Sequence, residues 1–112
     1  MTVIAIITNL PDSESAFNLA RTLVARRLAA CVNVLAPATS FYRWEGHEEE
    51  ASEVPVLIKS TAERYPDLER AILELHPYSL PEIIALPVAQ GLERYLRWIE
   101  AECGTGGAEC AT

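Results

Sequence analysis

The feature that most constrains the fold of this chain is a long hairpin near its middle. Two β-rich arms, 31–44 and 47–61, meet at Glu45-Gly46, a credible two-residue turn because glycine supplies the positive φ that such turns need. Each arm is more than twice as long as an average strand of about 5–6 residues. Pro37 and Pro55 are expected to bend the arms midway. The outer halves should therefore leave the core and present unpaired edges.

Unpaired strand edges promote aggregation unless something covers them. The outer part of the hairpin is rich in glutamate, which we interpret as a solvated surface that repels wrong partners. It also carries three large aromatic residues of the kind enriched at interfaces, namely Phe41, Tyr42 and Trp44. Closed symmetric self-association would cover such edges. The sequence therefore predicts a homo-oligomer with these aromatics at its interface.

Apolar spacing predicts two amphipathic helices beside this hairpin. The first spans 13–28, with an expected inner stripe of Phe17, Ala20, Leu23, Val24 and Leu28. The second should start from a capping box of Ser60 and Glu63, with an inner stripe of Tyr65, Leu68, Ile72 and Leu75.

Apolar, β-rich runs at 3–7 and 82–88 predict two more strands, and a stripe through 92–99 predicts a last helix that ends near Cys103. This order is that of an α+β, ferredoxin-like split βαβ sandwich, with two helices on one face of a four-stranded antiparallel sheet. The long central β-hairpin and the extra C-terminal helix are additions to it. We expect one domain, 1–103, and a flexible C-terminal tail, 104–112.

Composition narrows the functional classes. The net charge of −7 and the pI of about 4.7 oppose binding to a nucleic-acid backbone. No segment approaches the ~20 apolar residues of a membrane span, and the N-terminus lacks the basic lead-in of a secretory signal. Cys31, Cys103 and Cys110 fit neither a disulfide framework nor a C-x-x-C site. We therefore expect a cytoplasmic protein with reduced thiols, and neither nucleic acid nor membrane as a partner.

A series of motifs makes the chain similar to a known family. They are Ala29-Ala30-Cys31-Val32-Asn33, Tyr42-x-Trp44-x-Gly46, Glu53-Val54, Lys59, His76-Pro77-Tyr78-x-x-Pro81-Glu82-Ile83-Ile84 and Tyr95-Leu96-x-Trp98-Ile99. In this order, across 3–102, they resemble the CutA family of divalent-cation tolerance proteins. The resemblance implies a ferredoxin-like subunit that forms a very stable homotrimer by strand pairing between subunits, and an association with copper and divalent-metal tolerance.

The resemblance also implies copper ligands at two places, a Cys near the end of the first strand and a His-His pair before Pro-Tyr. Here the strand ends in Ile7-Thr8 and the pair reads Leu75-His76, so His76 is the one implied ligand that is present. A single imidazole is too few ligands for closed coordination. We expect copper or another divalent cation to bind weakly, with His76 as its ligand.

The candidate site combines polar residues around a turn stiffened by two prolines. We expect His76, Tyr78 and Glu82 to line a cleft near a subunit boundary, with Cys31 and Lys59 approaching it from neighbouring strands. Simpler interpretations stand beside this one. His76 could cap the end of a helix, Cys31 could be a small core residue, and Lys59 and Glu82 could pair as charges at strand ends.

The sequence contains no Gly-x-Ser-x-Gly, no glycine-rich phosphate loop and no paired-His metal helix, so no catalytic residues and no enzyme are predicted. The favoured function is that of a trimeric metal-tolerance protein. The alternative is a trimeric small-molecule sensor similar to nitrogen-regulatory PII proteins, with ligand clefts between subunits. An enzyme built on Cys31 and His76 is a third, less favoured hypothesis. An acylphosphatase is excluded because 9–13 contain no Arg.

Overall fold

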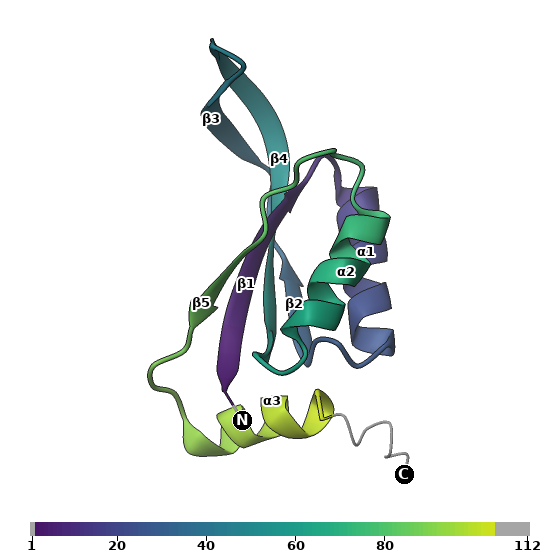
Figure 1. Cartoon of the computed structure of the whole chain (residues 1–112), viewed down its shortest axis with the longest axis vertical. Helices are drawn as coiled ribbons and strands as arrows, with labels where there is room; N and C mark the ends of the chain where they lie inside the picture. The colour runs from purple at the N-terminus through teal and green to yellow at the C-terminus, as the bar shows by residue number, and fades with distance from the viewer. Residues whose placement is uncertain (1, 105–112) are drawn as a thin grey trace.

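The sheet is built around two long neighbouring strands. In the computed structural model, which describes residues 2–104, β1 (Val3–Leu10) pairs antiparallel with the inner half of β4 (His47–Thr61). The short strands β2 (Cys31–Val34) and β5 (Ile84–Pro87) flank this pair, so that the order is β2-β4-β1-β5. All of these pairs are antiparallel (Figure 1).

Two helices, α1 (Ser13–Ala25) and α2 (Tyr65–Leu75), cover one face of this sheet (Figure 1). The side chains of β1 alternate in burial, because successive side chains of a strand point to opposite faces. The face of the sheet under the helices forms the main core with both helices, and its largest fully buried members are Ile6, Leu10, Leu19, Leu23, Ile58, Leu68 and Ile72. The predicted ferredoxin-like α+β fold is confirmed.

The central hairpin leaves the body of the molecule as a projecting ribbon (Figure 1). The strand β3 (Ala38–Trp44) pairs with the outer half of β4, from Ala38 opposite Glu53 to Trp44 opposite His47. Glu45 and Gly46 take φ values of 50° and 83°, as a two-residue hairpin turn requires. The predicted projection is confirmed. The first arm breaks between β2 and β3, around Pro37, whereas the second continues through Pro55 as one strand.

The first helix shows one error of the sequence analysis. Its buried residues are Ala16, Leu19 and Leu23, whereas Phe17 and Val24, which were expected inside, are 47% and 45% exposed. Each residue turns a helix by about 100°. Phe17 therefore lies one position away from the series that faces the sheet, and its hydrophobicity does not change that geometry.

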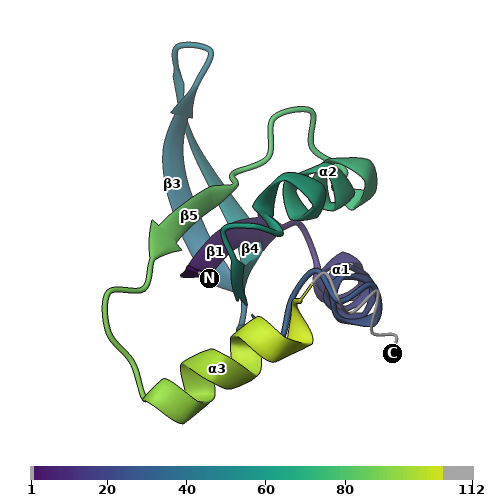
Figure 2. The ribbon, with the colours of Figure 1, turned by 60° about the horizontal axis from the view of Figure 1, so that its bottom comes forward.

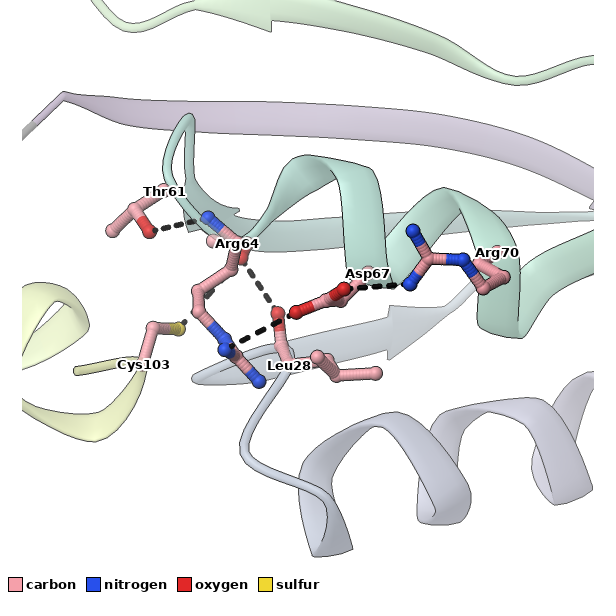
Figure 3. Close-up of polar contacts among 7 residues, drawn as sticks. Leu28, Thr61, Arg64, Asp67, Arg70 and Cys103 are labelled. Atoms are coloured by element: carbon pink, nitrogen blue, oxygen red, sulfur yellow. Dashed lines mark hydrogen bonds and ion pairs between the residues drawn. The ribbon is translucent and has the colours of Figure 1, made fainter. Parts of the chain in front are cut away.

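The predicted capping box of the second helix is also wrong. Ser60 lies within β4, where its buried hydroxyl donates to the carbonyl oxygen of Leu28 at 2.6 Å. The helix starts later, after Arg64, with Pro66 in its first turn as expected. Asp67 accepts from the guanidinium groups of Arg64 and Arg70, at 3.4 and 2.7 Å (Figure 3).

The predicted inner stripe of α2 is confirmed, since Leu68 and Ile72 are buried and Tyr65 and Leu75 pack against the core.

The last helix, α3 (Glu93–Glu102), crosses the end of the sheet far from the ribbon (Figures 1 and 2). It closes a second, smaller core in which Val3, Ile99 and Cys103 are buried. Arg27, just after α1, donates to the carbonyl oxygens of Ala101 and Glu102, both at 3.1 Å.

None of the helices in the described part of the chain is long and apolar enough to cross a membrane. The predicted tail lies outside the described residues, except for Gly104.

Candidate functional site

A cleft of about 740 Å³ lies where the ribbon meets the loop that joins α2 to β5. The loop runs back past the end of β1 before it enters β5 (Figure 1). One wall of the cleft comes from the ribbon and the other from the loop. The cleft is lined by Asn9, Ser40, Phe41, Tyr42, Trp44, Glu53, Pro77, Tyr78, Ser79, Leu80 and Glu82.

Glu53 is the most buried charged residue of this cleft, with 9% of its surface exposed. It lies opposite Ala38 in the ladder, and side chains of a directly opposed pair share a face of the sheet. Since strand side chains alternate, this is also the face of Ser40, Tyr42 and Trp44. The strand register thus places a carboxylate at the base of an aromatic wall.

Tyr78 joins the two walls of the cleft. Its hydroxyl donates to Oε2 of Glu53 at 3.2 Å. Partial burial, followed by this hydrogen bond and the nearby negative charge, raises the pKa of Tyr78 above its usual value. The phenol therefore stays protonated at neutral pH and acts as a neutral donor.

Glu82 holds the loop to the sheet. Its Oε1 accepts from Nδ2 of Asn9, a residue of β1, at 2.7 Å. This bond positions a second carboxylate in the same cleft. Lys59 and Glu82 do not pair as charges, since the Lys59 ammonium instead donates to Oδ1 of Asn33 at 2.5 Å.

His76 lies behind the cleft and supports the loop. It is 7% exposed and follows the last residue of α2. Its Nδ1 accepts from the backbone N–H of Tyr78 at 3.1 Å, and its Nε2 lies 2.6 Å from the carbonyl oxygen of Asn9. A carbonyl oxygen can only accept, so Nε2 carries the proton and the ring is neutral. Both ring nitrogens are therefore engaged.

Cys31 and Lys59 lie elsewhere on the sheet. They are directly opposite one another in the β2–β4 ladder, with Nζ of Lys59 4.0 Å from Sγ of Cys31. Lys59 is also opposite Ala5, four positions along β1 from Asn9, which corresponds to about 13 Å. Within one chain the structure thus brings Tyr78 and Glu82 together, with His76 behind them, and it does not bring Cys31 and Lys59 to their cleft.

Sequence reasoning missed Asn9 and Glu53 as cleft residues. The signal for Glu53 was its place beside Val54, the first residue of a buried apolar run, together with its register opposite Ala38. Asn9 carried no signal, because its role depends on a partner 73 positions away.

The donor set does not fit the copper ligands that the family implies. Residues 2–104 contain no group of three or more His, Cys, Asp or Glu side chains able to hold a metal ion. His76 has both ring nitrogens engaged, and the Cys31 thiol lies beside the ammonium group of Lys59, which repels a cation. In one subunit these side chains do not form a closed copper site.

The fold and site define a class, that of small ferredoxin-like subunits with a projecting ribbon and a ligand-sized cleft. Within that class, the chain belongs to the CutA1 family, described as "CutA1 divalent ion tolerance protein", whose model matches residues 4–102. It is a CutA-type divalent-cation tolerance protein, as the sequence predicted, and no comparison favours the PII-like sensor. The family is defined by cation tolerance and not by a known enzymatic activity.

Relatives and solved structures agree with this assignment. The divalent-cation tolerance protein CutA of Thermus thermophilus is 43% identical over 99 residues, which cover 88% of this chain and 96% of the relative. A Thermus thermophilus CutA1 structure superposes with a TM-score of 0.89 at 41% identity, covering 91% of this chain and 99% of that one. CutA from Xylella fastidiosa gives a TM-score of 0.88 at 44% identity, covering 92% and 99%.

Proposed function

We propose that this chain acts in divalent-cation tolerance as a homotrimer that is not an enzyme. The observation that carries the proposal is the uncovered face of the sheet, opposite α1 and α2. Ile84 and Leu86 of β5 are each nearly half exposed there. Trp98 of α3 is similarly exposed and stacks on Tyr95. Such an apolar surface is typical of a subunit interface.

The ribbon supports the same proposal. In the part of the chain that the structure describes, β3 pairs with β4 alone, so its other edge is free. Phe41 is 71% exposed on this strand, and Tyr42 and Trp44 follow it. This edge can pair with a different strand edge on the next copy, such as that of β2 or β5, and head-to-tail contacts of this kind close into rings. Three copies are the number that the family resemblance implies.

For copper or another divalent cation we propose weak binding only. A chain with a net charge of −7 attracts divalent cations over its whole surface, and a homotrimer would add three such fields. Attraction of this kind fades as added salt screens the charges. A site-specific component would require His76 to release its present partners.

We also propose that the chain has no catalytic activity and that it lies in the cytoplasm. His76 has both nitrogens engaged, one of them with Asn9. Cys31 lies at the level of Ala5, four positions or about 13 Å along the sheet from Asn9, so the pair does not form a nucleophile and its base. A related structure from Archaeoglobus fulgidus is described as a periplasmic CutA, and cell fractionation with a tagged chain tests the location here.

Light scattering on the purified protein tests the assembly. We expect three times the chain mass of 12.3 kDa, unchanged over a wide range of protein concentration. Leu86→Asp, which places a charge on the uncovered face, should dissociate the trimer, whereas Leu73→Asp, on the exposed side of α2, should not. A monomer at all concentrations, or equal effects of the two substitutions, would overturn the proposed assembly.

A further inference from the structure

A smaller pocket, of about 250 Å³, lies on the helix-covered side of the sheet, where the turn after α1 meets α2. Three arginines and two carboxylates line it, together with the buried apolar side chains of Leu28 and Ala71. The apolar surface proposed for the contact between copies lies on the opposite face of the sheet and on the ribbon. The pocket is therefore formed within one chain, away from both of these surfaces.

Positive charge is concentrated in this pocket although the chain is acidic overall. Three of the nine basic residues of the chain line it, namely Arg26, Arg64 and Arg70. The two carboxylates are those of Asp67 and Glu74, so the pocket has one more positive than negative charge, in a chain whose net charge is −7. The apolar part of the wall screens charges less than water does. This local balance favours a small anion as a ligand.

Arg64 is the most buried of the three arginines, with 19% of its side chain exposed. Its guanidinium group donates to one oxygen of Asp67 at 3.4 Å, whereas Arg70 donates to the other oxygen at 2.7 Å (Figure 3). Among residues 2–104, the buried Nε of Arg64 has no hydrogen-bond partner. Buried polar groups are normally hydrogen-bonded. The charge of Arg64 is therefore only weakly compensated, and its guanidinium group can accommodate a further acceptor.

The two carboxylates do not close the pocket. Asp67 and Glu74 are 49% and 59% exposed, so water screens much of their charge. Glu74 lies 3.5 Å from the guanidinium group of Arg26. An oxyanion that enters the pocket can keep these ion pairs and accept from the donors that they leave free. The planar fork of arginine matches the oxygens of a phosphate group.

We propose that this pocket binds a phosphate group. Arg64 is the buried donor, and the more exposed Arg26 and Arg70 donate from the sides. Guanidinium groups from two separate elements suit a tetrahedral oxyanion better than a planar carboxylate, because the phosphate oxygens point in several directions. The volume of about 250 Å³ is below that of sites for drug-sized ligands. The ligand is therefore inorganic phosphate or a small phosphate monoester.

Calorimetric titration of the full chain, in its native assembly, tests the ligand class. Inorganic phosphate is the first compound and acetate is its control, both at the same ionic strength, so that screening does not differ between them. Phosphate should bind with one site per chain and about tenfold more tightly than acetate, because it offers more acceptors to the arginines. Glycerol phosphate distinguishes the two sources. Tighter binding than that of inorganic phosphate indicates a monoester, and weaker binding indicates the free ion.

Substitutions in and outside the pocket locate the phosphate. Arg64→Gln and Arg70→Gln each remove one positive charge from the pocket and should weaken phosphate binding about tenfold. Arg21→Gln removes the same charge from an exposed position of α1 outside the pocket and should leave binding unchanged. Asp67→Asn removes the negative charge between Arg64 and Arg70 and should tighten phosphate binding several-fold. A purely structural role of the arginines would not produce this opposite effect.

Several results would overturn the proposal. They are the absence of saturable phosphate binding, equal binding of phosphate and acetate, equal binding by Arg70→Gln and Arg21→Gln, and weaker binding by Asp67→Asn than by the wild-type chain. If Arg64→Gln fails to fold, Arg70→Gln still decides the outcome, because the side chain of Arg70 is 67% exposed. Light scattering on each variant should show an unchanged assembly, since the pocket lies away from the proposed contact between copies.

Discussion

The Nε2 atom of His76 lies 2.6 Å from the carbonyl oxygen of Asn9, and the two residues are 67 positions apart in the chain. The same ring accepts from the backbone of Tyr78 through Nδ1. One imidazole thus joins the end of α2, the end of β1 and the loop of the cleft. Because a neutral ring with one donor and one acceptor satisfies both contacts, protonation or metal binding at His76 requires one of them to break.

The first prediction concerns the stability that this ring provides. His76→Ala leaves the partly buried Asn9 carbonyl oxygen and the Tyr78 N–H without these partners. We expect unfolding free energy to fall by about 1–3 kcal/mol, measured by urea unfolding. His47→Ala is the matched control, because His47 is exposed at the tip of the ribbon. Equal stability of the two variants would show that water replaces the ring without cost.

The second prediction concerns copper. With both nitrogens of His76 engaged, wild-type protein should show only weak copper binding that fades with salt, in calorimetry at low and moderate ionic strength. If His76 does release Asn9 for the metal, His76→Ala should abolish a saturable component that His47→Ala retains. Tight copper binding in all three proteins would remove His76 from the metal function altogether.

The third prediction follows from the raised pKa of Tyr78. A raised pKa means that folding favours the protonated phenol, so this contribution to stability is complete below about pH 10, the usual tyrosine pKa, and is lost as pH rises through the higher folded value. Spectroscopic titration of wild type against Tyr78→Phe should isolate its ionisation.

Glu53→Gln offers a check on the cause of this shift. Burial, the largest cause, remains in the variant, whereas the negative charge beside the phenol is removed. Tyr78 should therefore ionise at lower pH in Glu53→Gln than in wild type, while still above its usual value. An unchanged ionisation would show that the negative charge of Glu53 does not raise the pKa of Tyr78.

Regular elements of this fold could be predicted because their signals are local. The turn at Glu45-Gly46 follows from glycine geometry, and the apolar run through Val54–Ile58 gives the inner part of β4. The inner face of α1 could not be chosen with the same certainty. Phe17 and Leu19 are equally hydrophobic choices in the sequence, and only packing against the sheet selects Leu19.

The candidate site was only partly predictable, because its geometry depends on register. The motif around His76 and Tyr78 identified the loop. Whether Cys31 and Lys59 reach that loop depends on their positions in the ladder, which place them opposite each other near Ala5. The simpler interpretation of His76, a structural role at a helix end, agrees with its contacts, although it donates to Asn9 and not to the helix carbonyls.

The fourth prediction concerns Arg27, whose backbone takes φ of 60° just after α1. This left-handed conformation costs a residue with a side chain roughly 1–2 kcal/mol, and two hydrogen bonds to the end of α3 offset the cost. Arg27→Ala keeps the strain and removes both bonds, whereas Arg27→Gly also relieves the strain. Stability should therefore decrease from wild type to Arg27→Gly and further to Arg27→Ala. If thermal unfolding shows Arg27→Ala to be more stable than Arg27→Gly, this prediction is wrong.

The last prediction locates the C-terminal limit of the folded unit. Cys103 is fully buried beside Val3 and Ile99. The hydroxyl oxygen of Ser60 lies 3.8 Å from the sulfur of Cys103. Burial raises the pKa of this thiol, so it is neutral and packs as an apolar group. A chain truncated after Gly104 should keep the melting temperature and the assembly of the full chain. A chain truncated after Glu102 loses the buried sulfur and should be less stable by about 0.5–3 kcal/mol. If the first truncation is as damaging as the second, the folded unit extends beyond Gly104 and the predicted tail is wrong.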